Sequence, residues 1–96
     1  MLFIIDCEDK KGHADLRAST RRHHLEYITR FKNQVCAAGP TLAEDGESMT
    51  GSLLIIDFPS RDAAEGFAAG DPYHKAGLFE TVTIRPWKKV FPLEKN

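Results

Sequence analysis

The clearest pattern in the chain is a set of short apolar runs separated by polar stretches. Residues 2–7 (LFIIDC) and 52–58 (SLLIIDF) are apolar at successive positions, and both are too short for a typical buried helix. Residues 81–87 (TVTIRPW) alternate between apolar and polar side chains, as half-buried strands do. The pattern predicts three strands here, with a weaker fourth strand around residues 37–42.

Two longer segments have the features of helices. The first is expected to begin near Asp15 or Ser19 and to run to about Ala38, where Gly39 and Pro40 form a pair that stops helices. The second covers residues 59–70, with Ser60 as its N-cap and Gly70 as its stop. Between them, residues 41–50 are expected to form a flexible loop that could close over a ligand.

The resulting order is strand, helix, weak strand, strong strand, helix, strand. This βαββαβ pattern is consistent with an α+β fold of the ferredoxin-like type, with residues 1–96 as one domain. Two helices can cover only one face of such a sheet, yet the LFII and LLII runs require burial on both faces. A second subunit packed sheet to sheet is the simplest cover, so we expect a homodimer.

Composition narrows the range of functions. The 96 residues are 42% hydrophobic and 28% charged, which is typical of one globular domain. The formal net charge of −1 and the absence of a basic aromatic patch argue against nucleic acid as a partner. Residues 1–6 have neither the form of a signal peptide nor the length of a membrane span, so we expect a cytoplasmic protein with no membrane partner.

No motif for a metal or a cofactor is found. The two cysteines, Cys7 and Cys36, have no CxxC spacing and are interpreted as reduced packing residues. The four histidines are too scattered for a metal site, and HEXXH is absent. G-x-S-x-G and glycine-rich phosphate loops are also absent. We therefore expect a protein without metal or cofactor.

The first helix contains one notable polar stripe. With about 100° between successive residues, one narrow face holds positions spaced three and four apart: Arg17, Arg21, His24, Ile28, Phe31 and Val35. The neighbours Arg22 and His23 turn towards the edge or towards solvent. Cationic groups among apolar side chains require a nearby anion or acceptor, because burying them unpaired is costly.

Asp71 is the candidate partner, because it opens the turn before Pro72 just after the second helix. A carboxylate bonded to one imidazole nitrogen of His24 would make the other nitrogen a better general base. Arg17, with Arg21 as the weaker candidate, would supply positive charge for a carboxylate, phenolate or enolate of the ligand. Ser52 and Tyr73 are further possible hydrogen-bonding residues.

Less specific interpretations remain open. A histidine on an apolar face is often only a hydrogen-bonded core residue, and Asp-Pro commonly opens turns without any chemistry. Ser52 could simply open its strand. The rivals to a catalytic pocket are therefore a binding module for a small acidic metabolite and a purely structural or interaction domain.

Several short segments together resemble the YciI-like (YCII-related) family of small α/β proteins. They follow one another along almost the whole chain: LFIID, R-x-x-x-R-x-x-H-L from Arg17 to Leu25, AAGP at 37–40, GS at 51–52, DPY at 71–73, AGLFE at 76–80 and PWKKVF at 86–91. The usual PF before KK is PW here, and the loop at 41–50 is shorter than in some relatives.

The resemblance implies a ferredoxin-like subunit that forms a homodimer with facing sheets. It also implies a pocket around a histidine and an aspartate, which match His24 and Asp71, and it adds Gly39 and Pro40 to the ligand-binding positions. The activity attached to the family is the cofactor-free dehydrochlorination of a chlorinated hydroxyhydroquinone. This implies a lyase acting on a small-molecule substrate.

Overall fold

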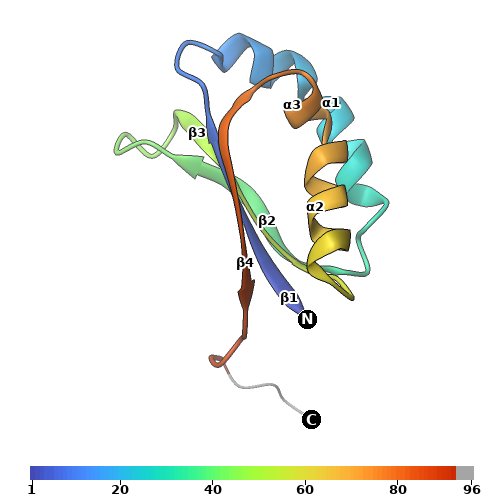
Figure 1. Cartoon of the computed structure of the whole chain (residues 1–96). Helices are drawn as coiled ribbons and strands as arrows, with labels where there is room; N and C mark the ends of the chain where they lie inside the picture. Colours follow the sequence, from blue (N-terminus) through green and yellow to red (C-terminus); the bar gives the residue numbers. More distant parts are fainter. Residues whose placement is uncertain (93–96) are drawn as a thin grey trace.

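The computed structural model describes residues 1–92 and contains a four-stranded antiparallel sheet. The strands are β1 (Leu2–Asp9), β2 (Val35–Leu42), β3 (Met49–Asp57) and β4 (Phe79–Trp87), arranged in the order β2-β3-β1-β4 (Figure 1). The two central strands contain the LFII and LLII runs, as expected for the most apolar segments. The predicted ferredoxin-like fold is confirmed.

Three helices lie together on one face of this sheet (Figure 1). They are α1 (Ala14–Thr29), α2 (Arg61–Gly70) and a single short turn, α3 (Pro72–Lys75). Ser60 is the N-cap of α2, and its side chain accepts a hydrogen bond from the Ala63 N–H. Helix α3 was not predicted, because its four residues are too few to produce a periodic pattern.

The first helix is shorter than predicted. It ends at Thr29 instead of Ala38, and tight i to i−3 hydrogen bonds follow, including Phe31 N–H to Ile28 O and Gln34 N–H to Phe31 O. Val35 then starts β2, which is a full eight-residue strand. The Gly39-Pro40 pair therefore lies inside an edge strand, where proline is tolerated.

The core lies between the helices and the inner face of the sheet. Phe3 and Ile5 of β1 and Leu54 and Ile56 of β3 are buried on this face, and they pack in one cluster with Phe67 of α2. Phe31 and Val35, the last two residues of the predicted stripe, are partly buried against this cluster. They anchor the start of β2, whereas the arginines and the histidine at the other end of the stripe are not part of the apolar core.

Among residues 1–92, no helix lies on the outer face of the sheet (Figure 1). Ile4 of β1 pairs with Ile55 of β3, and Leu53 lies two positions along the same face with 39% of its surface exposed. Ile4 and Ile55 are half-buried, and Leu53 is exposed. Within residues 1–92, no helix is long and apolar enough to cross a membrane.

Residues 43–48 join β2 to β3 in a tight turn. Asp45 accepts hydrogen bonds from the backbone N–H groups of Glu47 and Ser48, and Gly46 has a φ of +73°, a left-handed conformation that suits glycine. Together with a hydrogen bond from the Ser48 hydroxyl, these bonds lower the pKa of Asp45 to about 2. A closing movement of residues 41–50 stays a prediction.

Candidate functional site

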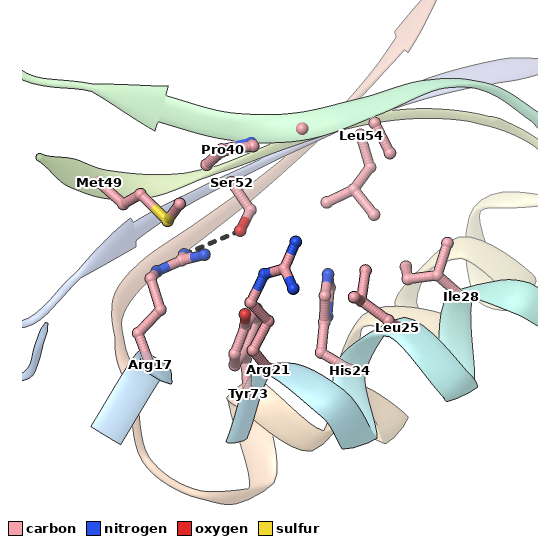
Figure 2. A pocket seen from close by; sticks show the side chains of 12 residues that line it. Arg17, Arg21, His24, Leu25, Ile28, Pro40, Met49, Ser52, Leu54 and Tyr73 are labelled. Atoms are coloured by element: carbon pink, nitrogen blue, oxygen red, sulfur yellow. Dashed lines mark hydrogen bonds between the residues drawn. The ribbon is translucent and has the colours of Figure 1, made fainter. Parts of the chain in front are cut away.

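A cavity of about 220 Å³ lies between α1 and the strands β2 and β3. Side chains from both layers point into it (Figure 2). Its lining is Arg17, Arg21, His24, Leu25, Ile28, Ala38, Gly39, Pro40, Met49, Ser52, Leu54 and Tyr73. The volume is below the roughly 300–1,000 Å³ of pockets for drug-sized ligands, so a single small molecule is the appropriate occupant.

His24 and Asp71 form a buried pair at this cavity. His24 Nδ1 lies 2.8 Å from Asp71 Oδ1, and the residues are only 9% and 2% exposed. Because a carboxylate can only accept, Nδ1 carries the proton of this hydrogen bond. The other nitrogen, Nε2, has no hydrogen-bond partner among residues 1–92. Every buried side-chain nitrogen or oxygen of these residues does have a partner, so Nε2 is not fully buried. Because His24 lines the cavity, Nε2 is open to it.

The position of Asp71 follows from its place between two helices. Asp71 is the residue after Gly70 of α2 and the N-cap of α3, and its Oδ1 also accepts a hydrogen bond from the Tyr73 N–H at 2.9 Å. Pro72 at the first helical position suits this geometry. The capping requirement of a one-turn helix therefore fixes the carboxylate at the Nδ1 edge of the imidazole.

Tyr73 holds the ring of His24 from one side. The two rings are stacked, with centroids 4.1 Å apart and planes inclined by 19°. Tyr73 is 2% exposed, and burial raises the pKa of its phenol, although the charges of Arg17 and Arg21 oppose the rise. A bond on one edge and a stacked ring on one face leave the imidazole little freedom to rotate.

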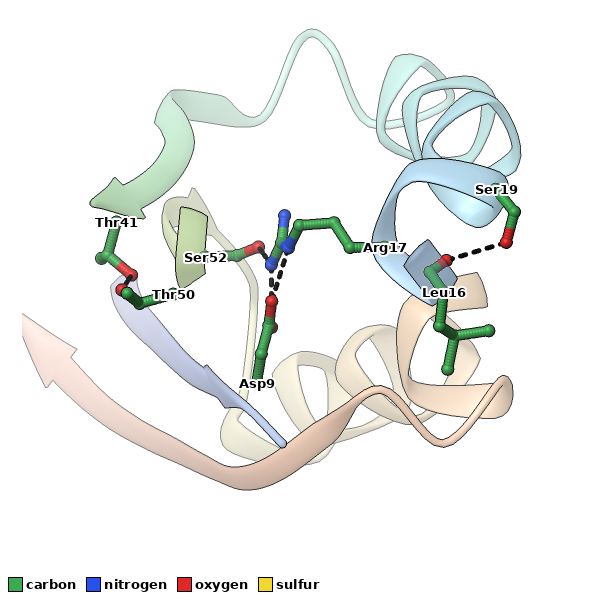
Figure 3. A network of polar contacts seen from close by, with 7 residues as sticks. All are labelled: Asp9, Leu16, Arg17, Ser19, Thr41, Thr50 and Ser52. Atoms are coloured by element: carbon green, nitrogen blue, oxygen red, sulfur yellow. Dashed lines mark hydrogen bonds and ion pairs between the residues drawn. The ribbon is translucent and has the colours of Figure 1, made fainter. Parts of the chain in front are cut away.

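Arg17 is already engaged with protein groups. Its Nε and Nη2 donate to Asp9 at 2.6 and 2.9 Å, and Nη2 also donates to Ser52 Oγ at 2.9 Å (Figure 3). Burial alone would lower the pKa of Arg17, but the hydrogen-bonded Asp9 carboxylate outweighs it and raises the pKa. The resulting brace joins the end of β1, the first turns of α1 and the start of the LLII run in β3.

Sequence reasoning missed Asp9. It lies in a polar stretch of acids and lysines that suggested a solvated loop, whereas the structure places it at the end of β1. The sequence did contain a clue to Asp9. Arg17 and His24 both need an anionic partner, and Asp71 alone would have to serve both, so a second carboxylate could have been expected nearby.

Arg21 differs from Arg17 in having no ion-pair or hydrogen-bond partner among residues 1–92. Its guanidinium points from α1 into the cavity beside His24 (Figure 2). Gly39 and Pro40 form part of the opposite wall in β2, and the Gly39 position has nothing within 4 Å of where a Cβ would stand. The wall is therefore open at that point.

Other polar and titratable side chains lie away from this cavity. His23 faces a different surface groove beside Tyr27, and Ser48 bonds Asp45 in the turn between β2 and β3. Cys7 is buried, and burial raises the pKa of its thiol to about 12, which keeps it protonated and unreactive. Among residues 1–92, no three His, Cys, Asp or Glu side chains are grouped as metal ligands would be.

Comparison with known proteins places the chain in a family. The model of the YCII-related domain matches residues 1–88. The chain belongs to the YCII-related family. A curated member, Protein YciI of Escherichia coli O6:H1, is 37% identical over 98 residues, which cover 95% of this chain and all of that protein. A Haemophilus influenzae protein without an assigned function is 35% identical over the same share of both chains.

Solved structures agree with this assignment. The 5-chloro-2-hydroxyhydroquinone dehydrochlorinase TftG of Burkholderia phenoliruptrix, in complex with 2,5-dihydroxybenzoquinone, superimposes with a TM-score of 0.85. It is 37% identical to this YCII-related chain and covers 92% of it, and the match covers 94% of TftG. An antibiotic biosynthesis monooxygenase, 18% identical with a TM-score of 0.55 over 94% of this chain and 99% of its own, shows the same fold.

Proposed function

We propose that this protein is a small cofactor-independent lyase that removes a proton from an anionic or phenolic ring compound, as in a dehydrochlorination. The observation that carries the proposal is the buried His24–Asp71 pair with Nε2 of the imidazole open to a cavity of about 220 Å³. The dehydrochlorinase activity of TftG, at 37% identity, supports the choice of reaction.

In the proposed mechanism, His24 acts as the general base through Nε2. The carboxylate of Asp71 keeps the proton on Nδ1 and stabilises the imidazolium that forms when Nε2 accepts a proton from the substrate. The cationic side chains at the cavity stabilise the negative charge that develops on the substrate oxygen. The proton is passed to the ring carbon that bears chlorine as the ring adopts its keto form, and chloride then leaves that carbon with the electron pair of the C–Cl bond while a second ring hydroxyl loses its proton. The net loss of one proton and one chloride needs no oxidant or reductant.

Arg17 positions the site in this scheme. Its hydrogen bonds to Asp9 and Ser52 hold α1 against the sheet, and its side chain forms part of the cavity lining. Tyr73 is the wall on which His24 rests. Gly39 and Pro40 would contact the ligand from β2.

The test is chloride release from 5-chloro-2-hydroxyhydroquinone by purified wild-type protein and by two matched variants. His24→Gln removes the proposed base, and His23→Gln makes the same change at the adjacent exposed position. We expect release to fall roughly 100-fold or more in His24→Gln and to stay at the wild-type rate in His23→Gln. Saturable ligand binding without chloride release in the wild type would favour the binding module instead.

The proposal extends to a homodimer in the cytoplasm, formed through the outer face of the sheet. The support is the row of partly exposed apolar side chains on β1 and β3, including Ile4 and Leu53, which no helix of the described residues 1–92 covers. A second copy of the same face would bury these groups. Sedimentation of the purified protein measures this directly.

A further inference from the structure

Three basic side chains line the cavity, and two of them already have carboxylate partners. Arg17 is paired with Asp9, and His24 with Asp71. Neither aspartate belongs to the cavity lining, so both carboxylates lie behind the basic groups they partner. The charge of Arg17 is balanced by Asp9, and Nδ1 of His24 is already bonded to Asp71, so a ligand would have to compete with a buried bond to use the Arg17 guanidinium or the His24 Nδ1–H.

Arg21 is the third basic group, and its charge is not balanced. It has no ion pair or hydrogen bond within residues 1–92, and its guanidinium points into the cavity rather than along the helix surface (Figure 2). Its neighbour Arg22 shows the contrast, because it pairs with Glu26 on the exposed side of α1. All five N–H donors of Arg21 are therefore available to a ligand.

The rest of the lining suits a ring. Leu25 and Ile28 line the cavity from α1, next to His24, and Leu54 lines it from β3 on the opposite side (Figure 2). A flat apolar ring between these side chains would bring a polar substituent to Arg21 and, beside it, to Nε2 of His24. A second ring would exceed a cavity of about 220 Å³.

We propose that Arg21 selects the charge of the ligand, and that this site takes single-ring compounds carrying one ionised oxygen group. This inference rests on the proposed function and makes it more specific, because it names the residue that recognises the substrate's charge. Arg17 then acts as a positioning residue that is neutralised by Asp9, and Arg21 is the arginine left to meet a negative charge on the ligand.

The test compares two rings of the same shape that differ in charge. Benzoate and benzamide are titrated into isotope-labelled protein, and binding is followed by amide chemical shifts. We expect wild-type protein to bind benzoate roughly tenfold or more tightly than benzamide, as a hydrogen bond to a charged group would give. The preference should disappear in Arg21→Gln and persist in part in Arg21→Lys, which keeps the charge.

Arg22→Gln is the matched control, because it removes the same charge from the next position of the same helix, outside the cavity. It should leave the preference unchanged. Equal binding of both rings by the wild type, or an unchanged preference in Arg21→Gln, would overturn the inference. Absence of saturable benzoate binding in the wild type would overturn it as well.

The two proposals can fail separately. If chloride release depends on His24 but the benzoate preference survives Arg21→Gln, only the role of Arg21 is wrong. If the preference is lost in Arg21→Gln while no chloride is released by the wild type, the site recognises anions as inferred, and the proposed reaction is wrong.

Discussion

Each ring nitrogen of His24 has a different environment. Nδ1 faces the carboxylate of Asp71 at 2.8 Å, and Nε2 faces the cavity. This difference matters more for the proposed chemistry than the burial of the residue, because a base must offer a nitrogen without a proton to its substrate. The proposed mechanism therefore depends on which nitrogen of His24 carries the proton.

We expect neutral His24 to carry its proton on Nδ1 in the wild type and in Asp71→Asn, but to shift it towards Nε2 in Asp71→Ala. Asparagine still has a side-chain oxygen, and the Tyr73 N–H, which needs an acceptor, orients that oxygen towards His24. Alanine has no acceptor there. The ¹⁵N chemical shifts of the imidazole identify the tautomer, with exposed His23 as an internal reference. A proton on Nε2 in the wild type would remove the proposed base.

At the scale of the elements, α2 contains a matched pair of glycines that tests how the helices pack. A methyl group added at Gly66 would have nothing within 4 Å, whereas one added at Gly70 would lie 2.5 Å from the hydroxyl of Tyr27. That hydroxyl donates to the Phe67 carbonyl at 2.9 Å, so Gly70 permits the close contact between α1 and α2. The same mutation should therefore have opposite effects at the two positions.

We expect Gly66→Ala to raise the free energy of unfolding by about 0.5–1 kcal/mol, because alanine is the better helix former. Gly70→Ala should lower it by about 1–3 kcal/mol, because the Tyr27 ring must move or lose its bond. Urea unfolding measures both changes. Equal stabilisation in the two variants would show that α1 and α2 are less closely packed than this contact requires.

The elements also show what the sequence could predict. The apolar runs of β1 and β3 and the N-cap of α2 identified these elements, because burial and capping leave local patterns. The end of α1 was wrong, because residues 30–34 have no strong stop signal and the pairing of β2 with β3 decides their conformation. Long-range pairing is invisible to a local pattern.

In the candidate site too, local patterns could be predicted and long-range contacts could not. The stripe of Arg17, Arg21 and His24 could be predicted from helical spacing, because the three residues share one helix. The different roles of Arg17 and Arg21 could not be predicted from spacing. They depend on Asp9, which lies at the end of β1 and pairs with Arg17 only in the folded chain. Which arginine is left unpaired is a property of the tertiary structure.

At the scale of the whole molecule, the described residues 1–92 leave one face of the sheet covered by the helices α1, α2 and α3 and the other face uncovered (Figure 1). The central strands are apolar on both faces, and Leu53 on the open face is 39% exposed. A chain of 96 residues has a limited core, so a second copy would add apolar burial that the monomer cannot supply. The oligomeric state therefore bears on stability as well as on assembly.

We expect the wild-type protein to sediment as a dimer at micromolar concentration and the Leu53→Lys variant to sediment as a monomer. A lysine at position 53 of each copy would place two like charges in the apolar interface. Val90→Lys is the matched control, since Val90 is 71% exposed and follows β4, beyond the paired strands. It should remain dimeric. A monomeric wild type, or a Leu53→Lys variant that still dimerises, would exclude this face as the interface. Loss of the dimer should also lower the unfolding temperature and make it independent of protein concentration, because association no longer stabilises the folded chain.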